Sequence, residues 1–154
     1  MYAQDTSVPV EKSRAEIERL LMQHGADKFM VGSDSAKAML AFQIRGKMIQ
    51  FTLPLPDKSD KRFRTTPTGR IKRNENAAYE GWEQACRSRW RALFLCIKAK
   101  IEAVECGITS FESEFLAHFV MPDGKTIGER LLPKLEDATS KGIMPRLMLT
   151  QGDD

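Results

Sequence analysis

Residues 75–107 carry the pattern that most restricts how this chain can fold. Apolar residues recur there every three or four positions, which is the period of an α-helix. Gly107 follows them as a typical helix stop. The stripe consists of Tyr79, Trp82, Cys86, Trp90, Leu93, Ile97, Ile101 and Val104. Because one stripe of this length runs along a single helix, the other elements are expected to pack along it.

Residues 37–53 show a different period. Apolar and polar residues alternate there, which is typical of strands with one buried face. A two-residue Gly46-Lys47 loop suits a type II′ hairpin turn. This turn predicts three cross-strand pairs with all six side chains on one face: Ile44 with Ile49, Phe42 with Phe51, and Leu40 with Leu53. A shift of one residue would expose all six, so we expect this register.

Shorter patterns complete the expected fold. Residues 10–24 have helical spacing, and Phe29 and Val31 alternate in a short first strand. Thr109 and Thr126 each precede a glutamate by three residues, which predicts a capping box at the start of two short helices. We therefore expect an α+β fold with an N-terminal helix, a three-stranded antiparallel meander, a long central helix and short C-terminal helices.

The expected domain is a single unit from residue 1 to residue 142. Residues 143–154 are expected to form a loose tail, with Ile143 and Leu147 as its candidate anchors. Within the domain, residues 58–74 form a stretch that we call the basic segment. Its proline, threonine and glycine content opposes both helix and strand, so we expect a flexible, poorly packed loop.

The basic segment is unusual in its charge. It has a net charge of +6, whereas the whole chain has +3, so the rest of the chain is acidic. The segment contains one acid, Asp60, and seven cations: Lys58, Lys61, Arg62, Arg64, Arg70, Lys72 and Arg73. A local excess of this kind favours a local anionic partner, although a solvated linker is the alternative interpretation.

A nucleic acid is the anionic partner that we expect. Cations on a mobile backbone can contact phosphates and gain affinity by releasing counterions. Phe63 could stack on a base, and Arg87 and Arg91 could extend the basic surface along the long helix. The candidate nucleic-acid-binding residues are Lys58, Lys61, Arg62, Phe63, Arg64, Arg70, Lys72, Arg73, Arg87 and Arg91.

No catalytic motif for phosphate, dinucleotide or acyl chemistry occurs in the chain. Glu112, Glu114 and Asp123 with Lys125 could suggest a metal nuclease, but the segment around Asp123 fits a turn better. Ten-residue steps separate the three cysteines along the expected helix, so their thiols point in different directions. We therefore expect no enzyme activity, no catalytic residue, no metal site and no cofactor.

The chain has no apolar run long enough to span a membrane and no signal-peptide core near Met1. We expect a cytoplasmic protein without a membrane partner.

Three stretches of the chain stand out: YAQDTSVPVEKSRAEIERLL, FTLPLPD, and AAYEGWEQACRSRWRALFLCIKAKIEAVECGITSFESEFLAHFVMPDGKTIGE. Together they resemble a family of small uncharacterised proteins encoded by bacteriophages and prophages. The resemblance covers residues 2 to about 130 and implies a setting in the cytoplasm of a bacterial host.

The first expected function is that of a non-enzymatic nucleic-acid-binding accessory protein. The alternative is a protein-binding inhibitor or adaptor of the anti-defence type, with a host protein as partner. A homodimer is compatible with both functions.

Overall fold

The structure is a computed structural model that describes residues 2–146. The chain begins with helix α1 (Val10–Gln23) and continues into strands β1 (Ala26–Ser33), β2 (Lys37–Ile44) and β3 (Lys47–Pro54). The remaining elements are helices α2 (Lys61–Arg64), α3 (Glu75–Glu105) and α4 (Phe111–Phe115), the 3-10 turn η1 (Leu116–His118) and helix α5 (Ile127–Lys141). This order confirms the predicted α+β fold.

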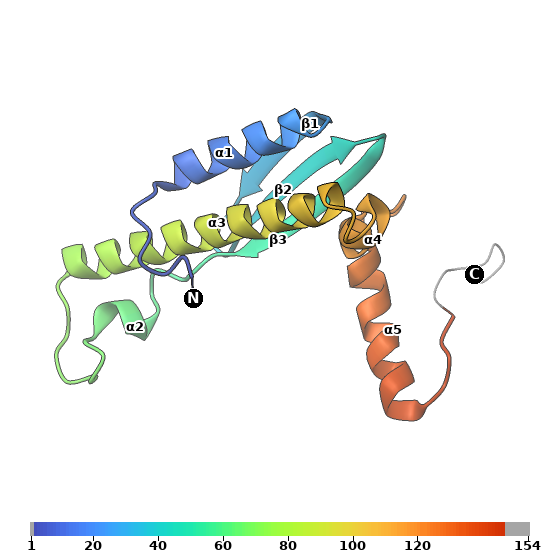
Figure 1. Ribbon diagram of the computed structural model, residues 1–154. Helices are drawn as coiled ribbons and strands as arrows, with labels where there is room; N and C mark the ends of the chain where they lie inside the picture. The colour runs from blue at the N-terminus through green and yellow to red at the C-terminus, as the bar shows by residue number, and fades with distance from the viewer. Residues whose placement is uncertain (1, 147–154) are drawn as a thin grey trace.

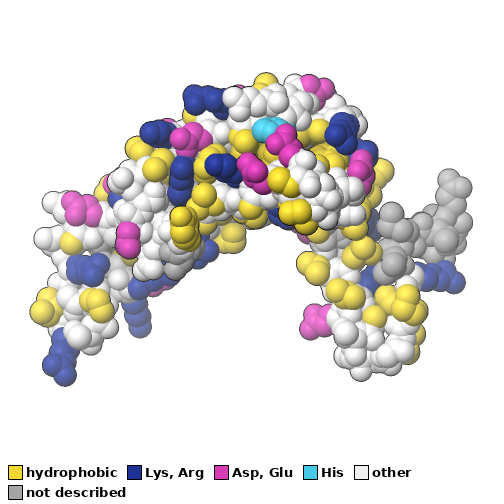
Figure 2. Space-filling model, viewed as in Figure 1, with side chains coloured by type: hydrophobic (Ala, Val, Ile, Leu, Met, Phe, Trp, Pro, Cys, Tyr) yellow, Lys and Arg dark blue, Asp and Glu magenta, His cyan; other side chains and the backbone are white. Residues whose placement is uncertain are grey.

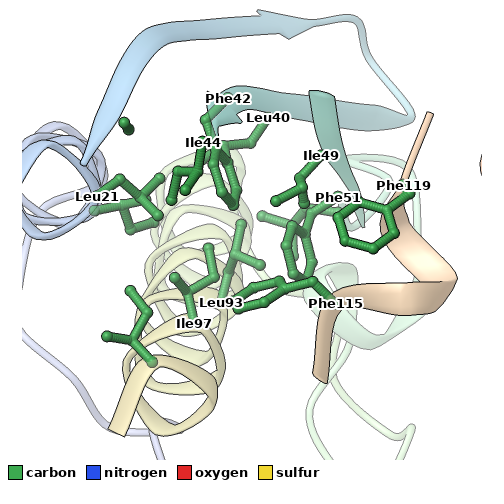
Figure 3. Packing of buried hydrophobic residues seen from close by; sticks show 14 of the residues in the cluster. Leu21, Leu40, Phe42, Ile44, Ile49, Phe51, Leu93, Ile97, Phe115 and Phe119 are labelled. Carbon is green, nitrogen blue, oxygen red and sulfur yellow. The ribbon is translucent and has the colours of Figure 1, made fainter. Parts of the chain in front are cut away.

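One face of the sheet forms the hydrophobic core. The strands form an antiparallel meander in the order β1-β2-β3, and helices α1 and α3 lie side by side against it (Figure 1). Figure 3 shows the hairpin side chains meeting Leu93 and Ile97 of α3, with Phe115 closing one end. Phe115 is buried edge-on against Phe42, with ring centroids 6.3 Å apart. Burial of this apolar surface is the main driving force for the fold.

The predicted hairpin register is wrong by two residues. The loop is Arg45-Gly46, and Phe42 pairs with Ile49 rather than with Phe51. Arg45 and Gly46 both have positive φ, 53° and 74°, as a type I′ turn requires. A type II′ turn has positive φ at its first central residue only, so the two positive φ values exclude the expected type II′ turn. A two-residue shift keeps the alternation, so all six predicted apolar side chains are still buried.

Helix α3 begins and ends close to where its sequence pattern predicts. Asn74 caps its first turn by accepting a hydrogen bond from the Ala77 backbone N–H at 2.8 Å. The stripe is buried at Cys86, Trp90, Leu93, Ile97 and Ile101, as predicted. At the N-terminal end, however, α3 extends past the sheet (Figure 1), and Tyr79 is 49% exposed. The first part of the predicted core stripe is therefore available for another role.

The C-terminal part of the described chain projects from the core. Thr126 and Glu129 form the predicted capping box of α5, whereas Ser110 rather than Thr109 caps α4. Helix α5 has no buried residue and extends away from the sheet (Figure 1). Ile143 is 65% exposed, so it does not anchor the chain end, and Leu147 lies outside the described residues.

Candidate nucleic-acid interface

The basic segment contains one short helix, so the prediction that it lacks helix is wrong, whereas no strand lies within it, as predicted. The Asp60 carboxylate accepts a hydrogen bond from the Arg62 backbone N–H at 2.9 Å and caps the single turn of α2. The chain then reverses, with a β-bridge between Thr65 and Lys72. Gly69 has a φ of 69°, which permits this reversal. The segment's predicted mobility stays a prediction.

One contact attaches the basic segment to α3, and a second attaches the chain just before the segment. Phe63 is buried, 6% exposed, at a point where Gly81 of α3 has no side chain. The Trp82 indole N–H donates to the Pro56 carbonyl oxygen at 2.8 Å. Phe63 therefore serves as an anchor, and the prediction that it stacks on a base is wrong, because a buried ring offers no free face.

A pocket of about 480 Å³ lies between the basic segment and the start of α3. Four of the predicted cations of the basic segment come together there, because the chain reversal brings the end of α2 beside Lys72. The Arg73 backbone N–H donates to the Arg64 carbonyl oxygen at 2.7 Å and fixes this closure. The lining residues are Lys58, Arg64, Lys72, Arg73, Asn74, Glu75, Ala78, Tyr79 and Trp82.

The charges around the pocket are unbalanced. Its lining holds four cations against the single carboxylate of Glu75. Within residues 2–146, Arg62 is the only cation of the basic segment with a carboxylate within 4.0 Å, and its partner is Asp60. Figure 2 shows Lys and Arg side chains at this end of the arched molecule. The pocket is therefore suited to an anionic ligand.

Two aromatic rings form one wall of the pocket. The centroids of Tyr79 and Trp82 are 5.6 Å apart, and the Lys58 ammonium lies 4.2 Å from the Trp82 ring and 5.2 Å from the Tyr79 ring. A hydrogen bond to Glu83 raises the pKa of Tyr79 above its ordinary value. The sequence pattern assigned both rings to the core. The signal against that assignment was their position at the end of the stripe, next to the basic segment.

The other predicted site residues lie outside this pocket. Lys61, Arg62 and Arg70 belong to the basic segment but do not line the pocket. Arg87 donates to Gln84 Oε1, with its Nε at 3.1 Å. Arg91 forms an ion pair with Glu16 of α1, so it lies at the contact between the two helices and does not extend the basic surface as predicted. Its position follows from the packing of α1 on α3, which the sequence pattern did not define.

A second hollow of about 440 Å³ shares Tyr79 and Trp82 with the basic pocket. Its lining includes the acids Glu11, Asp34 and Glu83. The two rings thus separate a basic hollow from one with an acidic side. An anionic ligand is expected in the basic hollow alone.

The carboxylates considered for a metal nuclease do not converge. Each pairs with a different cation: Glu112 with Lys47, Glu114 with Lys100, and Asp123 with Arg130. Across residues 2–146, no group of three or more His, Cys, Asp or Glu residues is placed to hold a metal ion. The three cysteines are free, and burial raises the pKa of Cys86.

The comparisons with known proteins gave no match: no family model, curated protein or solved structure is similar enough to the chain. No helix within residues 2–146 is long and apolar enough to cross a membrane.

Proposed function

We propose that this protein is a non-enzymatic nucleic-acid-binding accessory protein that holds phosphates at the basic pocket. The convergence of Lys58, Arg64, Lys72 and Arg73 on one hollow beside two aromatic rings carries the proposal. Cations concentrated at one place release condensed counterions when they meet a phosphate backbone, and this release is favourable. The aromatic wall adds a surface that phosphate-only binding would not need.

The proposed setting is the cytoplasm of a bacterial host, with the gene carried by a phage or prophage. This setting follows from the sequence resemblance alone. In it, an accessory protein of replication or recombination would encounter nucleic acid directly. The proposed binding needs no metal, cofactor or catalytic residue.

Salt dependence tests the proposal. Four phosphate contacts predict that the logarithm of the binding constant falls with the logarithm of salt concentration with a slope of about −3 to −4. We would measure this slope by fluorescence anisotropy with labelled single-stranded and duplex DNA and RNA. Absence of binding to all four at low salt would contradict the proposal.

A matched pair of variants locates the binding site. The pocket variant R64Q/K72Q/R73Q and the control variant K61Q/R62Q/R70Q each remove three positive charges from the basic segment. We expect the pocket variant to weaken binding at least about tenfold and to reduce the salt slope by about 2 to 3. The control should lose much less affinity. Equal losses would show that general charge, rather than the pocket, is responsible.

A protein-binding role is the second candidate, and the exposed apolar residues of α5 favour it. Leu132 and Leu135 are 64% and 58% exposed on a helix that has no buried residue. Exposed apolar patches commonly mark protein interfaces. Affinity purification from host lysate should then recover one stoichiometric, nuclease-resistant protein that is lost with L132S/L135S. Recovery of nucleic acid alone would argue against this role.

A further inference from the structure

The aromatic wall of the basic pocket includes one half-exposed ring. Tyr79 is 49% exposed, whereas Phe63 and Trp90 are 6% and 4% exposed. The Tyr79 ring is therefore accessible to a ligand that enters beside the cations and displaces the Lys58 ammonium. Base stacking on such a ring is tolerant of sequence because every base has a π-face.

The wall is fixed in position before any ligand arrives. The Trp82 indole is held by its hydrogen bond to Pro56, and the Tyr79 hydroxyl interacts with Glu83 on the same helix. Both rings project from α3, which is a continuous helix from Glu75 to Glu105. A prepositioned stacking surface reduces the conformational entropy lost on binding.

From these features we propose that the pocket selects single-stranded nucleic acid. One unpaired base stacks on Tyr79 while its neighbouring phosphates contact Arg64, Lys72 and Arg73. In a duplex, each base is covered on both faces by its stacked neighbours and cannot reach the ring. The volume of about 480 Å³ lies within the range of pockets that enclose small ligands. This inference rests on the proposed nucleic-acid-binding function and specifies its substrate.

Lys58 has to change its contacts when a base stacks on Tyr79. Its ammonium lies over both rings, so a stacking base has to displace it from Tyr79. The flexible lysine stem allows the charge to move to a phosphate of the bound strand. The cation–π contact is thereby replaced by a charge-assisted contact, and the lysine charge stays satisfied.

The number of cations favours a strand over a free nucleotide. Four cations come from three places in the segment: before α2, at its end, and after the chain reversal. Glu75 is the one carboxylate in the lining. Successive phosphates of one strand can use cations that are spread in this way, whereas the single phosphate of a mononucleotide can use fewer of them.

The experiment compares two variants at one ring. We would measure anisotropy with a labelled oligothymidylate and with a blunt-ended DNA duplex of equal phosphate number. The wild type should bind the single strand on the order of tenfold more tightly than the duplex. Y79L should lose most of this preference because its single-strand affinity falls much more than its duplex affinity, since leucine is apolar but lacks the π-face. Y79F should retain the preference.

The outcomes separate the two proposals. Equal wild-type affinity for both DNAs, or equal loss of both in Y79L, would overturn the single-strand inference and leave the nucleic-acid-binding function standing. Absence of binding to either DNA at low salt would overturn both. Thymidine monophosphate serves as competitor. If it displaces the strand at a concentration close to that of unlabelled oligothymidylate, the ligand is a nucleotide and the inference is wrong.

Discussion

At the scale of single residues, His118 makes the stability of the fold depend on pH. Its ring stacks on Phe51 with centroids 4.0 Å apart, and it is half-buried. Burial lowers the pKa of His118, and the nearby Lys100 charge acts in the same direction. A weaker hydrogen bond with the Gln50 backbone opposes this shift. The folded state therefore favours the neutral imidazole.

This lowered pKa predicts acid sensitivity. The unfolded chain binds the proton more readily, so stability is greatest above the ordinary histidine pKa of about 6.5 and declines as the pH falls toward the lowered value. H118F keeps a ring on Phe51 but cannot titrate. Urea unfolding above and below about pH 6.5 should show a smaller loss of unfolding free energy for H118F than for the wild type. An equal loss in the two proteins would contradict the prediction.

At the scale of elements, an ion pair contributes to the packing of α1 on α3. The side chains of Glu16 and Arg91 are only 26% and 23% exposed, and Arg91 also lies 4.3 Å from the Phe94 ring. A partly buried pair is screened less than a surface pair. We expect a double-mutant cycle of E16Q and R91Q to give a coupling free energy of about 0.5–1 kcal/mol by urea unfolding.

The pair of Asp137 and Lys141 provides the control for that cycle. Its side chains are 68% and 62% exposed on a single helix, so the D137N/K141Q cycle should give no more than about 0.5 kcal/mol. A coupling at Glu16 and Arg91 no larger than this would show that this ion pair does not stabilise the packing of α1 on α3.

The boundaries of the elements and their buried faces could be predicted from the sequence, because both depend on local periodicity. The helical spacing after Glu75 and the alternation from Lys37 to Leu53 both predicted the correct buried faces. The register of the hairpin could not be predicted from the sequence pattern. Alternation restricts the strand pairing to shifts of an even number of residues, and the conformation of Arg45-Gly46 selects one of them.

At the scale of the whole molecule, Gly128 determines how α5 meets the core. A Cβ atom at this position would lie 2.9 Å from the backbone oxygen of Ala117, so the helix would have to move. G128A should therefore lower the unfolding free energy. The steric cost of about 1–3 kcal/mol exceeds the gain of at most about 1 kcal/mol from higher helix propensity.

Gly81 is the matched control because it also lies within a helix. A Cβ atom there would lie 3.5 Å from Phe63, an ordinary contact, so G81A should be neutral or stabilising. Urea unfolding measures both effects, and small-angle scattering should show a changed arch only in G128A. A stabilised G128A of unchanged shape would contradict the close contact of α5 with η1.

The sequence alone determined the order of the elements, their buried faces and the charge concentrated in residues 58–74, because each of these is a local property of the chain. The tertiary structure decided which charges meet. It brought Lys58, Arg64, Lys72 and Arg73 together, buried Phe63, and paired Arg91 with Glu16. It also left Tyr79 exposed where α3 extends past the sheet. These outcomes depend on contacts between segments far apart in the chain, and no local pattern specifies them.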